Sequence, residues 1–433
     1  MSAAKAGVSI SDKPTQNMSC DAGVCTATAK KAVLNVDDLQ AMLASGDIAV
    51  ATGGVTENID INRPLSWAST SRLTLDAKQS VVVKRPVTVT GAGALIIVHN
   101  DGGTTGDLIF FGKGAIAFLN PESALTINGS SYTLVYDIAT LANAVAHDMS
   151  GKFALTSNYD AGNARYAGSP VPEFGGTFEG LGHRLSHIHV HDGPHDSYVG
   201  FFGKLDSSAV VRDIGFENGT LTSKHAYFVG GVAGLNLGSI VGAHVSGKVR
   251  GTSAYTGGLA GYNDQYATIS RSSADVDVRG STTGGLVGNS YGVIDQCFAS
   301  GTSSVGGGLV GLQSWGQITN SYASGRVSSG IGGLVGLGLI TVTSSYSTAE
   351  VGPTNFSGGL IGEVHANAVQ ASYWDIDTAG VAYGCGEGDC SGVAGLSDAQ
   401  LKSALPPGFD PKVWAQNAGI NNGYPYLLAN PPQ

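Results

Sequence analysis

Six glycine clusters recur through the second half of the chain and constrain its fold more than any other feature. Each cluster reads Gly-Gly-x-x-Gly, with a pair of small or branched apolar residues between the glycines. The clusters begin at 230, 257, 284, 307, 332 and 358, so successive steps are 27, 27, 23, 25 and 26 residues. A period in this range indicates stacked structural repeats. The glycines concerned are Gly230, Gly231, Gly234, Gly257, Gly258, Gly261, Gly284, Gly285, Gly288, Gly307, Gly308, Gly311, Gly332, Gly333, Gly336, Gly358, Gly359 and Gly362.

A second apolar run follows each glycine cluster in register. Ile318, for example, leads to Ser321 and Tyr322. Gly, Ser and Asn separate these runs and leave no room for a helix of ten residues. Each repeat therefore predicts short strands joined by turns. The β-branched residues at the corresponding place in the six repeats are Ile240, Ile269, Ile294, Ile318, Val342 and Val369.

Strands of this kind cannot bury their apolar side alone, so equivalent strands are expected to stack on one another. Parallel stacking about 4.8 Å apart pairs each strand with the coils on both sides. The sequence therefore predicts an all-β protein. Its fold would be a parallel β-helix solenoid with short flanking helices and terminal caps, and right-handed winding is the expected hand. Two rows of side chains would then face the core. One is formed by the β-branched residues named above, and the other is formed by Leu259, Leu286, Leu309, Leu334 and Leu360.

The first third of the chain carries strand patterns without the glycine period. Apolar runs between residues 73 and 127 follow one another closely, with Gly, Asn and Pro between them. They favour further β-helical coils, and an antiparallel sandwich is the alternative. Three segments predict short helices instead, at 37–46, 137–147 and 397–405, the last with Ser397 as its N-cap.

The glycine repeats resemble the GLUG motif, which is named for its Gly-Leu-x-Gly core. Residues 176–183, Gly-Thr-Phe-Glu-Gly-Leu-Gly-His, are similar to the segment that precedes such repeats, and residues 372–375, Ser-Tyr-Trp-Asp, are similar to the end of the last one. The resemblance is strong over residues 175–380. It implies a region of a large bacterial surface or secreted protein, notably an adhesin of the filamentous-haemagglutinin type. An outer-membrane secretion partner is implied by the same resemblance.

On this basis the chain divides into five predicted parts. Residues 1–35 would be a polar N-terminal segment or cap, 36–132 a β-helical segment of filamentous type, and 133–199 a helix with lead-in strands. Residues 200–380 would form the GLUG repeat β-helix. Residues 381–433 would form a C-terminal cap with a cysteine loop, whose aromatic residues are expected to plug the last coil.

Composition limits the partners of the chain. The net charge is −10, which argues against nucleic acid and anionic membranes, because both select basic surfaces. No stretch of 18 apolar residues exists, so no membrane insertion is expected. No cofactor is expected either, since phosphate-binding and dinucleotide-binding motifs are absent from a supporting context. Met1 is not followed by a signal-peptide pattern, which for an exported family suggests a piece of a longer protein, and a complete cytosolic chain is the alternative.

The cysteines form two local pairs and one single residue. Cys20 and Cys25 are five residues apart, as are Cys385 and Cys390. Both pairs are candidate disulfides closing small loops in an oxidising compartment. Metal binding is the competing interpretation, although this spacing is not that of zinc fingers. Cys297 takes the place of a serine found in other repeats and is expected to be a buried filler.

A histidine-rich stretch is the strongest candidate for metal chemistry. On a strand, His187, His189 and His191 would alternate onto one face. Three imidazoles on one face could bind a transition metal or titrate together near pH 6. The alternative is that Ile188 and Val190 fill the core while the histidines face water. That second interpretation is favoured, so no metal site is assigned.

Two groups of charged residues are candidates for catalytic carboxylates, because some β-helices are polysaccharide lyases or hydrolases. Catalysis of this kind needs carboxylates paired across a groove or set beside basic residues. Neither group repeats from coil to coil in a way that builds a cleft, so no catalytic residue is assigned. The groups are Asp206, Arg212, Asp213 and Glu217, and Arg271, Asp275, Asp277 and Arg279.

The function predicted from the sequence is a non-enzymatic, extracellular adhesin segment at a bacterial cell surface. It would present a binding surface to a host-cell or bacterial receptor or to a glycan, because the long sides of a solenoid suit extended contacts. One alternative is a carbohydrate-active β-helix enzyme. The other is a purely structural spacer of a larger surface protein.

Overall fold

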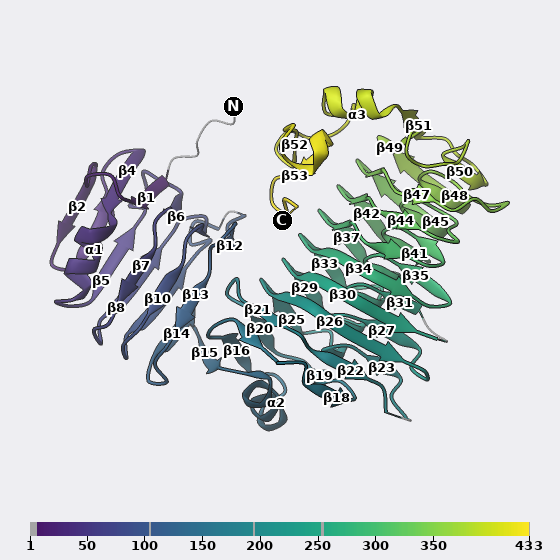
Figure 1. Ribbon diagram of the computed structural model, residues 1–433. Coiled ribbons are helices and arrows are strands. Elements are labelled where there is room, and N and C mark those ends of the chain that lie inside the picture. The colour runs from purple at the N-terminus through teal and green to yellow at the C-terminus, as the bar shows by residue number, and fades with distance from the viewer. Residues whose placement is uncertain (1–6, 104, 194, 253–254, 433) are drawn as a thin grey trace. The chain divides into compact units, whose positions relative to one another are not determined.

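The computed structural model describes residues 7–103, 105–193, 195–252 and 255–432 as a mostly β protein. Strands of successive coils lie side by side as rungs, and nearly all of them pair in parallel with the next coil (Figure 1). The prediction of a parallel β-solenoid is therefore confirmed. The alternative of an antiparallel sandwich for the first third is wrong, since its strands also pair in parallel.

The chain folds into two compact units, which are described separately. The first comprises residues up to Leu141 with Gly151–Tyr159 and Phe178–Arg184, and the second comprises Ala142–Ser150, Asp160–Thr177 and Leu185 onwards. Helices occur in the three predicted segments, as α1 (Val36–Leu43), α2 (Ile138–His147) and α3 (Asp398–Ser403). Among the described residues, no helix has the length and apolar character needed to cross a bilayer.

Three strands make up each regular coil of the first unit. Inward side chains such as Ile59, Leu73 and Val87 have no exposed surface, and together they fill one core. The three coils are β6 (Asn58–Ile61), β7 (Leu65–Trp67) and β8 (Arg72–Asp76); β9 (Val81–Val83), β10 (Val87–Val89) and β11 (Ala94–Val98); β12 (Leu108–Phe110), β13 (Ile116–Phe118) and β14 (Ala124–Ile127).

Residues 7–35 belong to the core of this unit, so a merely polar cap is the wrong description of them. Val8 and Ile10 are fully buried. Their strand lies between two others that are distant in sequence, because β1 pairs with both β4 and β6. The strands of this segment are β1 (Gly7–Ser11), β2 (Met18–Asp21), β3 (Val24–Ala27) and β4 (Lys31–Asn35), and β5 (Ile48–Ala51) follows helix α1.

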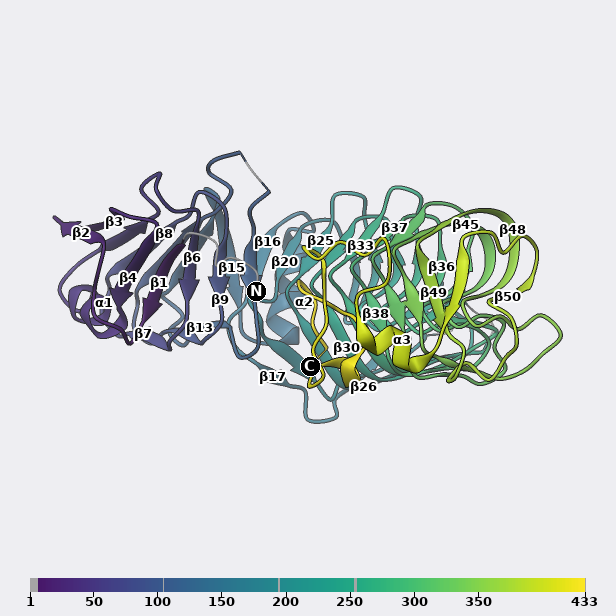
Figure 2. The same ribbon diagram turned by 90° about the horizontal axis from the view of Figure 1, so that it is seen from above.

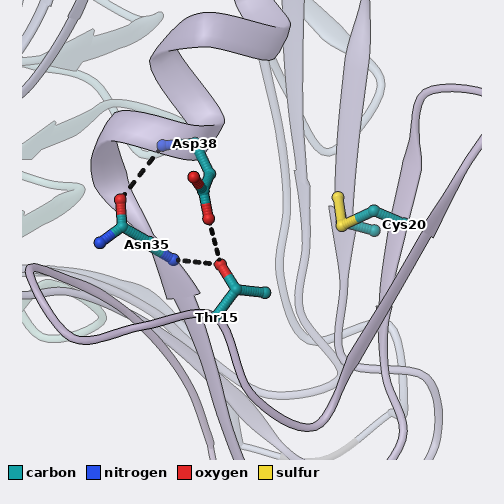
Figure 3. Close-up of a disulfide and its surroundings, with 5 residues drawn as sticks. Thr15, Cys20, Asn35 and Asp38 are labelled. Atoms are coloured by element: carbon teal, nitrogen blue, oxygen red, sulfur yellow. Dashed lines mark hydrogen bonds between the residues drawn. A yellow bond between two sulfur atoms is a disulfide. The ribbon is translucent and has the colours of Figure 1, made fainter.

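Helix α1 is fixed at its start by a polar cluster. The Asn35 side chain caps the helix by accepting a hydrogen bond of 3.1 Å from the backbone N–H of Asp38. The Thr15 hydroxyl donates to the Asp38 carboxylate at 2.6 Å and accepts from the Asn35 backbone N–H at 3.0 Å, as Figure 3 shows beside Cys20. Leu39 and Leu43 are completely buried on the other face of the helix.

The last coil of the first unit is completed by residues from much later in the chain. The Leu181 carbonyl accepts a hydrogen bond of 3.0 Å from the backbone N–H of Ile116, and the Leu181 side chain is fully buried in this core. His183 lies beside it with 4% exposure, and its Nε2 donates to the Ile116 carbonyl at 2.7 Å. Part of the Gly-Leu-Gly-His lead-in therefore belongs to the first unit. The strands near it are β15 (Ser130–Val135) and β16 (Lys152–Leu155).

Four strands make up a coil in the repeats of the second unit, and each pairs in parallel with its counterpart in the next coil (Figure 2). Three successive coils are β27 (Phe228–Gly230), β28 (Ala233–Asn236), β29 (Ser239–Val241) and β30 (His244–Gly251); β31 (Tyr255–Gly257), β32 (Ala260–Asn263), β33 (Thr268–Ser270) and β34 (Ser273–Arg279); β35 (Thr282–Gly284), β36 (Val287–Ser290), β37 (Val293–Asp295) and β38 (Phe298–Ala299).

Shorter or longer strands of the same kind precede and follow these coils. Before them come β17 (Tyr159–Asp160), β18 (Arg165–Ala167), β19 (Val171–Phe174), β20 (Thr177–Glu179), β21 (Arg184–Ser186), β22 (His189–His191), β23 (Tyr198–Val199), β24 (Phe202–Leu205), β25 (Val210–Arg212) and β26 (Gly215–Ser223). After them come β39 (Thr302–Ser303), β40 (Gly306–Gly307), β41 (Val310–Gln313), β42 (Gln317–Thr319), β43 (Tyr322–Ala323), β44 (Arg326–Val327), β45 (Val335–Thr343), β46 (Tyr346–Ser347), β47 (Glu350–Val351), β48 (Ile361–Gln370), β49 (Ser372–Asp375), β50 (Cys385–Glu387) and β51 (Val393–Leu396).

Both predicted inner rows are present. Every member of the leucine row has zero exposure, and the backbone N–H of Leu286 donates to the Leu309 carbonyl of the next coil at 2.9 Å. In the β-branched row, Ile294 pairs in register with Ile318, and the neighbouring coils continue the row in both directions. Each such buried side chain stabilises the fold by roughly 1.5–3 kcal/mol.

Close backbone approach explains the glycine clusters. A Cβ added to Gly284 would lie 1.9 Å from the Val287 carbonyl oxygen and 2.6 Å from the backbone nitrogen of Gly311. Both distances are far below any van der Waals contact. The backbone of Gly284 does not need a positive φ, so here it is space, and not conformational freedom, that requires glycine.

The C-terminal segment packs against the side of the repeats, so the expectation that its aromatic residues plug the last coil is wrong. Phe298, Tyr322, Tyr346 and Tyr373 form an aromatic row on successive coils, and Trp414 packs on this row. Figures 1 and 2 show the segment, with β52 (Trp414–Ala415) and β53 (Tyr426–Leu427), beside the strands.

Candidate binding surface

The predicted histidine group does not converge on one point. His187 lies before strand β22 with a φ of 55°, and its Nδ1 is 2.9 Å from the Asp160 carboxylate. His189 contacts the Asn163 side chain at 3.0 Å, and His191 is exposed. Within the described part of the chain, no group of three or more His, Cys, Asp or Glu side chains is placed to hold a metal ion.

The first group of acidic residues is engaged in ion pairs. Lys204 lies 2.8 Å from Asp206 and 2.6 Å from Glu173, and these two carboxylates raise the pKa of the lysine. Arg212 Nε lies 2.7 Å from the Asp213 carboxylate. These contacts join neighbouring coils or neighbouring residues on the outer face.

The second group is arranged in the same way. Asp277 lies 3.3 Å from Arg250 of the preceding coil and 3.2 Å from Arg279 of its own strand. Asp275 is exposed on the same strand, β34. Asp277 is thus paired both with the preceding coil and within its own strand.

The two cysteine pairs differ in the structure. Cys20 and Cys25 form a disulfide, drawn in yellow at the right of Figure 3. Cys385 and Cys390 are free thiols, so the predicted second disulfide is not formed here. Burial and the neighbouring Cys390 raise the pKa of the Cys385 thiol. Cys297 is fully buried, as expected, in the row that Ser321 continues.

A row of exposed aromatic residues, which the sequence analysis missed, lies on one corner of the repeats. The corner is the loop between β32 and β33 and its counterparts in the next two coils, 264–267, 291–292 and 314–316. Tyr266 is 83% exposed and Trp315 is 62% exposed, while Tyr291 between them is half-buried. Tyr262 lies at the foot of this corner, with its ring centroid 5.5 Å from that of Tyr291. We call Tyr262, Tyr266, Tyr291 and Trp315 the corner row.

Partial burial at the foot of the corner row has an electrostatic effect. Desolvation, with Tyr291 close by, raises the pKa of Tyr262 to about 12. The Tyr262 ring also packs on Phe228, with a centroid distance of 4.7 Å, and Phe228 stacks on Tyr198 of the preceding coil at 5.7 Å. The corner row is therefore joined to further aromatic side chains on the adjoining sheet.

A buried polar ladder holds the corner in place. The Asn236 side chain donates to the Asn263 side chain of the next coil at 2.9 Å, and Asn263 donates to Ser290 at 3.3 Å. All three are completely buried. In the following coil, the buried side-chain amide of Gln313 donates to the Trp315 carbonyl. Because these bonds fix the loop backbone, the aromatic side chains are carried on an ordered support.

The fold and the repeats together define a parallel β-solenoid that contains GLUG repeats. The family model described as the GLUG motif matches residues 252–279 and 303–328. These two segments lie in neighbouring parts of the β31–β44 region and confirm the predicted repeat type. The match covers a small share of the chain.

Two known proteins are similar to longer parts of the chain. Halomucin from Haloquadratum walsbyi is 30% identical over 213 residues, which is 48% of this chain and 2% of halomucin. The chain thus spans a very small part of that relative. A crystal structure from Bacteroides ovatus, proposed to be an immunoglobulin A1 protease, covers 69% of this chain and 93% of its own at 19% identity, with a TM-score of 0.41.

Proposed function

We propose that this chain is a segment of a large extracellular surface protein and acts as a non-enzymatic adhesin. One flank of its repeats would present a binding surface to host cells, to other bacteria or to a glycan. The observation that carries the proposal is the coil-by-coil register of the repeats, with Ile240 through Val369 in one row. Such a row holds the outer side chains of successive coils in a fixed, regularly spaced array.

Two further observations support an extracellular location. The Cys20–Cys25 disulfide suits an oxidising compartment. The similarity to halomucin extends over only 2% of that protein, which supports the idea that repeats of this kind occur within much longer chains. An outer-membrane secretion partner is part of the same proposal.

The arrangement of the acidic residues favours binding over catalysis. A glycoside hydrolase needs two carboxyl groups that face each other across a substrate. Here Asp206 and Asp277 each lie within salt-bridge distance of a basic side chain on the outer face. Ion pairing of this sort serves the stacking of coils and leaves the carboxylates poorly placed for general acid–base work.

The proposal is tested by binding of the purified, fluorescently labelled protein to cultured epithelial cells and to bacteria. Saturable binding that unlabelled protein displaces, and that heat-denatured protein lacks, is the expected result. Sustained release of new chain ends from a polysaccharide would contradict the proposal in favour of an enzyme. Absence of saturable binding to all cells and glycans tested would favour a structural spacer.

A further inference from the structure

We propose that the corner row, Tyr262, Tyr266, Tyr291 and Trp315, is the binding site for an uncharged glycan chain. This inference deepens the proposed function, on which it rests, by naming the face and the chemical class of the ligand. Tyr266 and Trp315 keep 83% and 62% of their surface in water, although they are among the largest apolar side chains of the repeats. Exposed aromatic side chains with a polar edge are enriched where proteins bind ligands.

The spacing of the row suits a linear polymer. Tyr266, Tyr291 and Trp315 come from the same loop of three successive coils, and coils that pair in parallel lie about 4.8 Å apart. The row therefore runs along the axis of the stack and is about one side chain wide. The faces of sugar rings carry C–H groups that pack on aromatic rings, so an extended glycan can contact one ring after another.

The polar groups beside the row are hydroxyls, amides and one carboxylate, that of Asp264, which lies in the same loop as Tyr266 and helps to raise the pKa of Tyr262. The first outward positions of the adjoining strands include Ser239 and Thr268, whose hydroxyls lie 2.9 Å apart, and Gln317 two coils further on. Ser314, next to Trp315, donates to the Asn289 side chain at 3.3 Å. Hydroxyl and amide groups can donate to and accept from sugar hydroxyls, and they offer nothing that would neutralise an anion.

Charge and size argue against other occupants. A net charge of −10 disfavours uronic-acid or sulfated polymers, which would be repelled. A stable protein partner typically covers about 800 Å² on each side with an apolar centre. The corner row is narrow and bordered by hydroxyl and amide groups and by the Asp264 carboxylate. One further apolar side chain, Leu339, occupies the corresponding corner of the next coil with 38% exposure.

The ordered support strengthens the inference. The first loop residue of each coil donates its backbone N–H to the preceding coil, as Tyr291 does to the Asn263 carbonyl at 2.7 Å and Ser314 to the Ser290 carbonyl at 2.9 Å. Beneath them lies the buried ladder of Asn236, Asn263 and Ser290. A surface that is already ordered loses little conformational entropy on binding, which favours affinity.

The test measures binding of the full chain to soluble neutral polysaccharides, namely β-glucan, mannan, galactan and starch, by calorimetry and by affinity electrophoresis. A polyuronate serves as the charged comparison. We expect binding to at least one neutral polymer and weaker or no binding to the polyuronate. The variant Trp315→Ala should bind about tenfold more weakly, and Tyr266→Ala combined with it should lose binding at the highest concentrations used.

The matched control is Tyr383→Ala, because Tyr383 is 73% exposed on the last coil and lies outside the corner row. It should bind like the unaltered protein, and circular dichroism should show that all variants are folded.

Unchanged glycan binding in the Trp315 and Tyr266 variants would overturn the assignment of the face while leaving the adhesin proposal intact. Cell binding without binding to any neutral polymer would overturn the ligand class and indicate a protein receptor. If the unaltered protein binds neither to cells nor to any of the polysaccharides, the proposed function itself is overturned.

Discussion

The hydroxyl of Ser321 accepts a hydrogen bond of 3.1 Å from the backbone N–H of Cys297 in the preceding coil. It also donates to the Thr319 carbonyl at 2.7 Å. One coil further on, Ser345 accepts from Ser321 in the same way at 3.1 Å. A buried serine therefore satisfies one backbone donor at each turn of the stack. Cys297 takes this place in its own coil, and its thiol donates to the Asp295 carbonyl at 3.3 Å.

Replacing Ser321 by Ala should destabilise the second unit by about 1–3 kcal/mol, because the buried N–H of Cys297 would lose its acceptor. The free energy of unfolding, measured by chemical denaturation, checks this. Ser329→Ala is the control, since Ser329 is exposed and only its backbone is bonded to the preceding coil. Equal stability of the two variants would show that the serine row does not stabilise the stack.

Gly284→Ala should destabilise the repeats by several times the usual effect of a glycine replacement, roughly 3 kcal/mol or more, since overpacking forces backbone shifts. The reason is the 1.9 Å that would separate the new Cβ from the Val287 carbonyl. Thermal unfolding followed by circular dichroism measures the change. Gly419→Ala is the matched control, because the nearest atom to its Cβ would be 3.5 Å away and its φ is not positive. A tolerated Gly284→Ala substitution would mean that the backbone between Gly284 and Val287 can shift at little cost.

The inner rows could be predicted from sequence because the glycine clusters set the phase of every coil. Aligning Gly284 with Gly307 brings Ile294 and Ile318 to within one residue of each other, and the shared pattern of Ile, two residues, Cys or Ser and an aromatic residue then sets their register. Residues 7–35 could not be placed in this way. Val8 and Ile10 are a short alternation in a polar segment, and strand β1 pairs with β6, which lies about fifty residues later.

The corner row was hidden for a different reason. Its loops, 264–267, 291–292 and 314–316, have different lengths, so Tyr266, Tyr291 and Trp315 lie at three different distances in sequence from the glycine clusters of their own coils. Their common position becomes visible only when the strands on both sides are paired. The packing of the C-terminal segment against the side of the repeats could not be predicted from the sequence either, because Trp414 contacts residues about ninety positions earlier, such as Tyr322.

The first unit should lose stability as the pH falls from about 6.5 to about 4. Burial lowers the pKa of His183 from 6.5 to about 4. Between these values the unfolded chain binds a proton that the folded unit does not, so the free energy of unfolding decreases as the pH falls. The contribution of neutral His183 to the free energy of unfolding is fully present above pH 6.5. A pKa shift of this size corresponds to about 3 kcal/mol.

Denaturation of the unaltered protein and of His183→Gln at several pH values checks this prediction. The variant cannot titrate in that range, so its stability should vary less with pH, whatever its stability at pH 7. His191→Gln is the control, because His191 is exposed. An identical pH dependence in the unaltered protein and in His183→Gln would contradict the assignment.

Trp414→Ala should release the C-terminal segment from the aromatic row of Phe298, Tyr322, Tyr346 and Tyr373. The Trp414 ring lies 5.8 Å from that of Tyr346 and is 1% exposed, and removing a large buried aromatic side chain typically costs about 3–5 kcal/mol.

Release of the segment should uncover an apolar surface on successive coils, which predicts both a lower unfolding temperature and stronger binding of the dye ANS at moderate temperature. Trp315→Ala provides the comparison, because Trp315 is 62% exposed and its loss should change neither quantity. Tyr346→Phe tests the polar part of the same contact, since the Tyr346 hydroxyl donates to the Pro425 carbonyl at 2.6 Å. If Trp414→Ala leaves dye binding and melting temperature unchanged, the segment is held by its polar contacts and the aromatic row does not anchor it.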